Sequence, residues 1–410
     1  MPEVFGIVGA NIAGGRAAQT LRREGFEGEI KLIGAEAYPP YDRPPLSKEI
    51  LLDGMEPSQA FLQSADAWDA DGVELRLSTT VTRIDPGGGE LHLDSGATIS
   101  VDKVLLCTGG HVRRLDVAGA HLEGVEYLRT LDDAVSIRSA LEARGSVVVV
   151  GGGFIGAEVA ACARQAGCDV TLLEIEDVPL WRVLGRELGS IVTEFHRSEG
   201  IRILANTGLA SIGGRRSVQY VETTNGERID ADLVVIGVGV VPATELAEGA
   251  GIGVCDGILV DEYCRTSNPN VFAAGDVANH PNDILGHRVR LEHWQNAQNQ
   301  AAAAACSMLG IERKFREVPW FWSDQYDVSI QMSGYPSPTD SVLYRGDPTS
   351  RSFSAFFLRD GILRSTFGVN RSRDVKRTMQ FIESQVALDA EELSDESVDL
   401  RKIEPLIATV

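Results

Sequence analysis

The hydrophobic and polar positions of the chain form the same pattern twice. Residues 6–36 begin with an apolar run of strand length, pass through a glycine-rich turn and continue into an alanine-rich amphipathic segment. A second apolar run follows and closes on Glu36. Residues 147–177 repeat this order, and their second apolar run closes on Glu174. Each copy predicts a strand, a tight turn, a helix and a second strand, which is the βαβ unit of a parallel sheet.

The repetition continues after each unit. Residues 91–110 alternate apolar and polar positions around an Asp-Ser-Gly turn and then enter an apolar run that ends in glycines. Residues 218–239 do the same around Asn225-Gly226. This alternation predicts an antiparallel meander and a return strand behind each βαβ unit.

The turns of the two units carry a dinucleotide-binding fingerprint. Residues 151–156 read GGGFIG and complete the G-x-G-x-x-G pattern, whereas residues 9–14 read GANIAG, with Asn11 at the middle position. The middle glycine lets the backbone approach a pyrophosphate closely. Because asparagine has a short side chain and tolerates positive φ better than most residues, we expect the first turn to remain a phosphate cradle.

An acidic residue lies at the expected distance from each fingerprint. Glu36 follows Gly14 by 22 residues, and Glu174 follows Gly156 by 18. An acid about 20 residues on accepts hydrogen bonds from an adenosine ribose. Two such sites predict FAD together with a nicotinamide nucleotide. A carboxylate at Glu174 favours NADH, since it would repel the additional phosphate of NADPH.

Composition narrows the choice of class and partner. The chain has 410 residues and a formal net charge of −21, which argues against nucleic acid as a main partner. No apolar run is long enough to cross a bilayer, and the first residues lack the basic region of a signal peptide, so we expect a cytoplasmic protein with no membrane contact. None of the six cysteines is spaced C-x-x-C, so buried thiols are expected rather than disulfides or a metal site.

Six motifs, in order along the chain, make the sequence specific. They are YDRPPLSKEIL (41–51), LLCTGG (105–110), VVVVGGGFIGAEVAA (147–161), VFAAGDVA (271–278), LEHWQNAQNQ (291–300) and VPWFWSDQYDVSIQ (318–331). With this set the chain resembles the FAD-dependent, NADH-using ferredoxin reductases that serve Rieske dioxygenases and bacterial P450s.

The resemblance implies an α/β fold with two Rossmann-like dinucleotide-binding domains of the glutathione reductase type and an α+β C-terminal domain. The FAD-binding domain would be discontinuous, with residues 1–113 and 242–317. Residues 114–241 would form the NADH-binding domain, and residues 318–410 the C-terminal domain.

The resemblance also implies which residues line the two cofactors. For FAD they are Gly9, Asn11, Ala13, Gly14, Glu36, Arg43, Pro45, Lys48, Val81, Thr108, Gly109, Arg113, Gly275, Asp276, His293, Trp294 and Trp322. For NADH they are Gly151, Gly153, Phe154, Ile155, Gly156, Glu158, Glu174, Arg182 and Gly239.

Four residues are expected to serve the chemistry by the same resemblance. Lys48 would lie near the flavin and pair with Glu158 beside the nicotinamide. Either Trp320 or Trp322 would lie at the exposed flavin edge where electrons leave, and the sequence does not distinguish the two. The segment YDRPPLSK contains no cysteine, so thiol chemistry of the disulfide-reductase kind is not expected at the flavin.

The expected activity is therefore hydride transfer from NADH to FAD, followed by single-electron transfer to a [2Fe–2S] ferredoxin that feeds an oxygenase. The expected oligomeric state is a monomer or a weak homodimer. A rubredoxin or quinone-type reductase and a redox-sensing flavoprotein that acts mainly by protein binding remain alternatives. A carrier would approach an acidic chain most readily at a local basic face, and the last third of the chain offers Arg313, Lys314, Arg316, Arg371 and Arg373.

Overall fold

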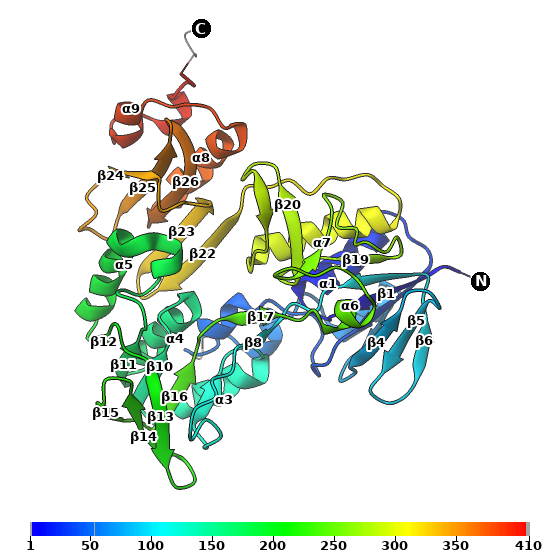
Figure 1. Ribbon diagram of the computed structural model, residues 1–410, viewed down its shortest axis with the longest axis horizontal. Coiled ribbons are helices and arrows are strands. Elements are labelled where there is room, and N and C mark those ends of the chain that lie inside the picture. Colours follow the sequence, from blue (N-terminus) through cyan, green and yellow to red (C-terminus); the bar gives the residue numbers. More distant parts are fainter. Residues whose placement is uncertain (1, 53, 407–410) are drawn as a thin grey trace. The chain divides into compact units, whose positions relative to one another are not determined.

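The computed structural model describes residues 2–52 and 54–406 and consists of two compact units (Figure 1). The first unit contains the residues up to 42 together with 58–111 and 241–321. The second contains residues 43–57, 112–240 and those from 322 onward. The short strands β8 (Gly110–Val112) and β17 (Val240–Pro242) lie where the chain passes from one unit to the other.

A five-stranded parallel sheet forms the centre of the first unit, in the order β19-β7-β1-β2-β3. Its strands are β1 (Val4–Val8), β2 (Glu29–Ile33), β3 (Val73–Arg76), β7 (Lys103–Leu106) and β19 (Val271–Ala273). Side chains on both faces of the central strand are buried, because Phe5 and Ile7 are 0% exposed and Val8 is 6% exposed. Continuous apolar runs are typical of parallel strands covered on both faces.

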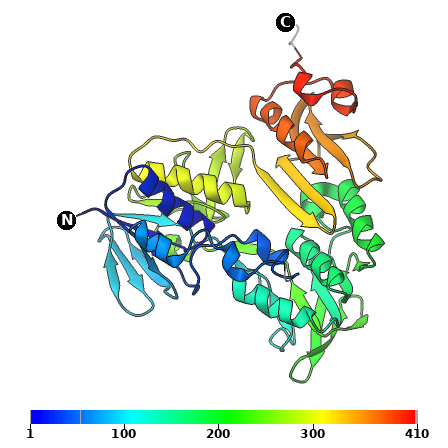
Figure 2. The same ribbon diagram turned by 180° about the vertical axis from the view of Figure 1, so that it is seen from behind.

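Two helices rich in small residues lie side by side in this unit, as both views of the ribbon show (Figures 1 and 2). They are α1 (Ile12–Arg23) and α7 (Trp294–Met308). Arg16 of α1 donates to the side chain of Gln298 of α7, at 2.6 Å. Alanine and glycine on the facing surfaces allow this close approach.

The other elements of the first unit are two small sheets and short helices. They are β4 (Val81–Asp85), β5 (Glu90–Leu93), β6 (Thr98–Ser100), β18 (Ile258–Leu259), β20 (Ala278–Asn282), β21 (His287–Val289), α2 (Ala65–Ala70), α6 (Glu245–Gly249) and the 3₁₀ turn η2 (Pro57–Ala60).

The second unit repeats the architecture of the first. Its parallel sheet has the order β12-β11-β10-β16-β9, so each strand has a counterpart at the same place in the first sheet. Its elements are β9 (Val125–Tyr127), β10 (Ser146–Val150), β11 (Asp169–Leu173), β12 (Arg202–Leu204), β16 (Leu233–Ile236), the meander β13 (Leu209–Gly214), β14 (Val218–Thr223) and β15 (Arg228–Asp230), the helices α3 (Leu131–Leu141), α4 (Phe154–Gln165) and α5 (Trp181–Ser198), and the 3₁₀ turn η1 (Pro44–Ser47).

The C-terminal part of the second unit is an antiparallel sheet with helices after it. The sheet has the order β22-β23-β26-β25-β24. The elements are β22 (Trp320–Gln325), β23 (Val328–Gly334), β24 (Ser341–Arg345), β25 (Phe353–Arg359), β26 (Ile362–Val369), α8 (Ser372–Ser384), α9 (Ala390–Ser394) and the 3₁₀ turn η3 (Leu400–Lys402).

The predicted internal repeat and the predicted α/β fold class are confirmed. Each half has a parallel sheet followed by a three-stranded meander, β4-β5-β6 in the first and β13-β14-β15 in the second. The boundaries of the three expected domains stay a prediction.

Candidate active site

The first glycine turn joins β1 to α1 and depends on two glycines. Gly9 has a φ of +116°, and a Cβ there would lie 2.1 Å from the carbonyl oxygen of Cys107. A Cβ on Gly14 would lie 2.0 Å from the carbonyl oxygen of Gly9. No other residue type fits either position without moving the backbone.

Asn11 does not adopt the positive φ that its place in the fingerprint predicted, so that prediction was wrong. Its φ is −118° and its ψ is −169°, which is extended backbone that any residue adopts. The side chain instead caps the helix. Its Oδ1 accepts from the N–H of Ala13 at 3.0 Å and of Gly14 at 3.3 Å, and its Nδ2 donates to the carbonyl oxygen of Cys107 at 2.6 Å.

The second glycine turn joins β10 to α4 with the same geometry. Gly151 has a φ of +101°, and a Cβ on Gly156 would lie 1.9 Å from the carbonyl oxygen of Gly151. Gly153 is the N-cap of α4, with open space around its Cβ position and no side-chain cap within the described part of the chain. No side chain at the N-cap therefore competes with an anion such as a pyrophosphate for the N-terminus of α4.

The two predicted ribose acids occupy different registers. Val8 pairs with Ile33 in the first sheet and Val150 with Leu173 in the second, so Glu174 corresponds to Gly34 rather than to Glu36. The sequence spacing concealed this offset of two residues. The two acids are thus not equivalent, although each follows the second strand of its unit.

Each acid is held by specific donors. Glu174 is 8% exposed, and its carboxylate accepts from the N–H of Gly152 at 2.7 Å and of Glu176 at 2.9 Å. The carboxylate of Glu36 accepts from the hydroxyl of Tyr41 at 2.5 Å. Glu174 is thereby fixed beside the glycine turn, where an adenosine ribose of a bound dinucleotide would lie.

The start of α7 gathers several residues predicted for FAD. His293 is the N-cap, and its ring packs against Phe321 with centroids 4.9 Å apart. Burial lowers the pKa of His293 to about 4, so the ring is neutral near pH 7. Trp294 donates its indole N–H to the carboxylate of Asp42 at 2.6 Å, which fastens the loop before η1 to the first turn of this helix.

The residues of the first unit fit FAD by two further observations. Gly275 has a φ of +82° and donates its N–H to Gln300 at 2.9 Å, and its Cβ position lies 3.2 Å from Ala13. At the N-cap and in the first turns of α7, three buried polar atoms have no hydrogen-bond partner among the described residues: His293 Nδ1, Asn296 Oδ1 and Gln300 Nε2. A glycine that brings the backbone close to the α1 turn and unpaired buried polar atoms are features that a polar cofactor would explain.

Lys48 and Glu158 form the predicted ion pair. Their Nζ and Oε1 atoms lie 2.8 Å apart, and the residues are 9% and 2% exposed. The same Oε1 accepts from the hydroxyl of Ser323 at 2.6 Å, and Oε2 accepts from the hydroxyl of Ser47. Burial raises the pKa of Glu158, whereas Lys48, Ser323 and Ser47 act in the opposite direction by favouring the ionised form.

One thiol lies close to this pair. Cys162 Sγ is 3.3 Å from the carbonyl oxygen of Ser47, and burial raises the pKa of Cys162 to about 12. The thiol is therefore protonated and unreactive near neutral pH. All six cysteines are free, five are buried and Cys255 is exposed, in agreement with the expected buried thiols except at Cys255.

Other residues predicted for the two cofactors lie in loops and at element ends. Arg43 donates to the carbonyl oxygen of Arg129, and Pro45 is part of η1. The N–H of Arg113 donates to the carbonyl oxygen of Gly239 at 2.9 Å. Arg182 is exposed, 3.7 Å from Glu176.

The remaining predicted residues lie near the ends of strands or helices. Thr108 donates to the carbonyl oxygen of Ala243 at 2.7 Å, and Gly109 accepts from the N–H of the same residue at 3.0 Å. Val81 is the buried first residue of β4, and Ile155 in the first turn of α4 is 47% exposed. Asp276 follows Gly275, and the half-buried Trp320 and Trp322 lie in β22.

Some residues that contact the predicted site residues, directly or in the case of Gln325 through Ser323, were not singled out from the sequence. They are Tyr41, Asp42, Ser47, Gln300, Ser323 and Gln325. All six lie inside the quoted motifs YDRPPLSKEIL, LEHWQNAQNQ and VPWFWSDQYDVSIQ. The motifs were therefore the available signal, but a motif does not say which carboxylate a serine or tryptophan reaches.

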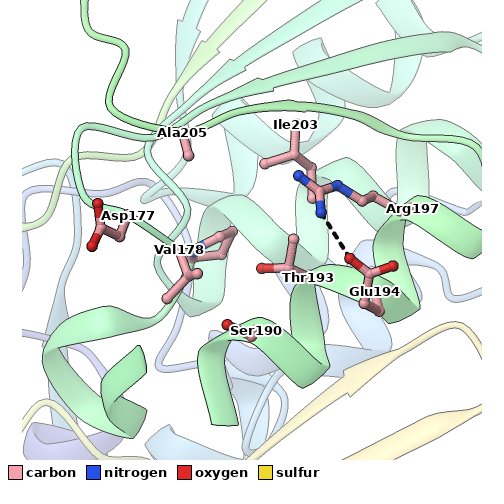
Figure 3. A pocket seen from close by; sticks show the side chains of 9 residues that line it. Asp177, Val178, Ser190, Thr193, Glu194, Arg197, Ile203 and Ala205 are labelled. Atoms are coloured by element: carbon pink, nitrogen blue, oxygen red, sulfur yellow. Dashed lines mark hydrogen bonds and ion pairs between the residues drawn. The ribbon is translucent and has the colours of Figure 1, made fainter. Parts of the chain in front are cut away.

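A cavity of about 180 Å³ lies in the second unit at the edge of its parallel sheet (Figure 3). It is lined by the loop 177–179, one side of α5 and β12, with Thr193, Glu194 and Arg197 at its wall. Glu194 and Arg197 pair with each other at 2.7 Å. None of the predicted site residues lines this cavity, although the loop 177–179, which lines it, closely follows Glu174 in the sequence.

Within residues 2–52 and 54–406, no group of three or more metal-ligating side chains is present, and no helix is long and apolar enough to cross a membrane.

Similarity to known proteins decides the family. Residues 5–301 match the pyridine nucleotide-disulphide oxidoreductase family, and residues 320–404 match the reductase C-terminal family. The chain belongs to the pyridine nucleotide-disulphide oxidoreductases, among their ferredoxin reductases. It is 40% identical to the ferredoxin–NAD(+) reductase component of the anthranilate 1,2-dioxygenase system of Burkholderia cepacia, over 97% of this chain and 98% of that protein. It is 39% identical to rhodocoxin reductase of Rhodococcus erythropolis, over 96% and 93% of the two chains.

Solved structures give the same result for this oxidoreductase. The chain superposes on the reductase of a covalent putidaredoxin reductase–putidaredoxin complex with a TM-score of 0.95 and 35% identity, covering 98% of this chain and 97% of that one. It matches the ferredoxin reductase for the CYP199A2 system of Rhodopseudomonas palustris with a TM-score of 0.94, 36% identity and coverage of 98% and 99%. FAD and a nicotinamide nucleotide are the cofactors of this family.

Proposed function

We propose that the chain is an NADH-dependent reductase of a [2Fe–2S] ferredoxin that feeds an oxygenase, either a Rieske dioxygenase or a cytochrome P450. The observation that carries this proposal is the buried Lys48–Glu158 ion pair. The segment 41–48, which supplies Lys48, contains no cysteine. A site without a reactive cysteine has no means of passing electrons to a disulfide. Similarity to reductases named for dioxygenase systems and for putidaredoxin supports a ferredoxin as the carrier.

FAD, when bound, supplies the redox chemistry by accepting a hydride from NADH and releasing its electrons one at a time. The protein supplies binding and electrostatics. The glycine turn 9–14, Gly275 and the start of α7 would hold FAD, with Glu36 near its ribose. The turn 151–156 and the N-terminus of α4 would hold the NADH pyrophosphate, with Glu174 at its ribose.

The Lys48–Glu158 pair is assigned to the nicotinamide. A lysine held by a buried carboxylate keeps one position, so it can orient a bound group without moving. Trp320 or Trp322 would lie at the flavin edge that faces the carrier. We expect a monomer or a weak homodimer, because a transient encounter with a carrier needs only one exposed face. Sedimentation velocity would measure the oligomeric state.

Carrier reduction by the purified, FAD-loaded protein tests the proposed function. NADH should reduce a [2Fe–2S] ferredoxin catalytically, with a larger kcat/KM than for rubredoxin or a soluble quinone. A matched assay with a small dye measures flavin reduction without a protein partner. Preference for rubredoxin or quinone would replace the carrier in the proposal, and a long-lived reduced protein that passes electrons to no carrier would favour the redox sensor.

A further inference from the structure

The carboxylate of Glu158 receives a hydrogen bond from a strand far along the chain. Ser323 lies in β22, its side chain is buried at 0% exposure, and its Oγ is 2.6 Å from Glu158 Oε1. The same oxygen faces Lys48 Nζ at 2.8 Å. Lysine and serine thus converge on one carboxylate oxygen, and the serine belongs to the C-terminal sheet rather than to the nucleotide-binding sheet.

The direction of this hydrogen bond is fixed by Gln325. Its Nε2 donates to Ser323 Oγ at 3.0 Å, and Gln325 is 3% exposed. A hydroxyl has a single proton to donate. Because Gln325 already fills an acceptor position of the Ser323 oxygen, the proton of Ser323 is left to point at Glu158.

We propose that Ser323 and Gln325 are positioning residues for the reduction step: Gln325 orients the Ser323 hydroxyl, and Ser323 holds the Glu158 carboxylate ionised and turned toward Lys48. This inference rests on the proposed function, in which the Lys48–Glu158 pair serves the nicotinamide. It assigns to the C-terminal sheet a part in hydride transfer.

The groups around the Glu158 carboxylate differ in how burial changes their pKa values. Lys48 is the only cation whose contact with this carboxylate the described residues record. Cys162 on α4 is a protonated thiol, since burial raises its pKa to about 12, with Glu49 acting on it in the same direction. Beyond Gln325, burial lowers the pKa of His196 to about 4, and burial raises the pKa of Tyr326, so both are neutral near pH 7. Glu158 is the carboxyl group at this place whose pKa burial raises, and its substitution is needed to identify its signal.

The test compares Ser323→Ala with the parent protein, both loaded with FAD. Infrared difference spectra across a pH titration, without NADH, would record the carboxylic acid band of Glu158, identified by its absence in Glu158→Gln. A hydrogen bond to a charged group favours the charged form by an amount equal to about one to two pH units. The band should therefore appear at a pH about one to two units higher in Ser323→Ala.

Stopped-flow reduction by NADH should show the same shift. The limb of the pH profile in which the rate falls with decreasing pH should move to higher pH in Ser323→Ala, while FAD content stays that of the parent. Ser323→Thr keeps a hydroxyl and should restore the parental profile. Ser333→Ala is the matched control, because Ser333 is also fully buried, lies on the adjacent strand β23 and has an Oγ without a hydrogen-bond partner among the described residues.

Gln325→Met provides a second test that leaves the Ser323 hydroxyl in place. It should shift the Glu158 titration in the same direction by a smaller amount, and it decides the matter if Ser323→Ala does not fold. An unshifted titration in both variants, or a Ser323→Thr profile as displaced as that of Ser323→Ala, would overturn the inference. Failure of the proposed function would look different, because the parent itself would then not be reduced by NADH or would not reduce a ferredoxin.

Discussion

The carboxylate of Glu174 accepts the N–H of Gly152 at 2.7 Å, so the acid that follows β11 is tied to the glycine turn that follows β10. A second N–H, from Glu176, holds the other oxygen at 2.9 Å. The carboxylate therefore has a fixed place beside the turn where a pyrophosphate would bind. The additional phosphate on the ribose of NADPH would be repelled by the Glu174 carboxylate, which these two hydrogen bonds hold in place.

Cofactor preference follows from this arrangement. The protein should prefer NADH to NADPH, and Glu174→Gln should lower kcat/KM for NADH about tenfold or more, because one charge-assisted hydrogen bond is worth about 1.5–3 kcal/mol. The same variant should raise the NADPH/NADH ratio. Steady-state kinetics with both nucleotides measures this, with Glu176→Gln as the control on the same loop. Equal use of both nucleotides by the parent would refute the role of Glu174.

Asn11 allows helix capping and phosphate binding to be separated. Asn11→Gly removes the hydrogen bond to Cys107, which contributes about 1 kcal/mol to the free energy of unfolding. It also removes the side-chain cap of α1, and glycine at an N-cap is less stabilising than asparagine by only about a few tenths of a kcal/mol. The melting temperature of the apoprotein should therefore fall. FAD affinity should hold or increase, because the N–H groups of Ala13 and Gly14 are released toward the pyrophosphate.

Asn11→Asp is the matched variant for this prediction. It keeps the acceptor for α1, loses the Nδ2 donor and adds a negative charge beside a diphosphate, so FAD should bind more weakly than to the parent. Thermal melts of the apoprotein and fluorescence titrations with FAD measure the two effects. If Asn11→Gly loses FAD as severely as Asn11→Asp, the turn is not the phosphate cradle.

Removing the lysine of the buried ion pair should affect both rate and stability. Lys48→Met should slow flavin reduction by NADH in stopped flow, with FAD content near that of the parent. It also leaves Glu158 buried without its cation, and breaking such a pair costs about 3–5 kcal/mol of the free energy of unfolding.

The stability loss in Lys48→Met should depend on pH with a definite sign. Burial already raises the pKa of Glu158, and loss of Lys48 raises it further. An acid whose pKa is raised by folding binds its proton more tightly in the folded state. The resulting loss in the free energy of unfolding is absent below the unfolded pKa of about 4.3 and is complete once the pH has risen through the folded pKa. Urea unfolding should give a larger difference between Lys48→Met and the parent at pH 8 than at pH 5.

Lys314→Met is the control for this pair. Lys314 and Glu262 are exposed partners 3.5 Å apart, and such pairs contribute about 0–1 kcal/mol. This variant should change neither the reduction rate nor the pH dependence of stability. An unchanged reduction rate in Lys48→Met would contradict a role of the pair at the nicotinamide.

The sequence pattern predicted the repeated architecture well because both halves bury the same periodic apolar runs in the same order. It failed where the answer depends on register or on contacts between distant segments. Glu36 and Glu174 looked equivalent by spacing, yet their strands place them two positions apart. A positive φ was expected for Asn11 because the fingerprint has a glycine at this position. Its backbone is instead extended, and its side chain caps α1. The contact of Ser323 with Glu158 joins residues 165 positions apart, and no local period marks it.

Carrier reduction should depend on salt in a way that locates the docking face. Arg313, Lys314 and Arg316 are exposed in the segment after α7, and the ion pair of Lys314 with Glu262 is exposed as well. Arg371, the N-cap of α8, likewise pairs with an acid, Glu396. The segment after α7 is chosen for the basic face because three of its residues 313–316 are exposed cations. A chain of net charge −21 would repel an acidic carrier at long range without such a face.

Electrostatic steering raises association rates by roughly 10- to 1,000-fold and fades as the Debye length falls from about 10 Å at 0.1 M salt to about 3 Å at 1 M. Ferredoxin reduction should therefore slow with rising salt, while reduction of a neutral dye should change much less. Arg313→Glu combined with Arg316→Glu should reproduce the high-salt defect at low salt, mainly in association rate. Arg215→Glu combined with Arg216→Glu makes the same charge change at exposed positions around the β13–β14 turn and should have little effect. Should carrier reduction accelerate with salt, net repulsion dominates the encounter, and the segment after α7 is not where the ferredoxin docks.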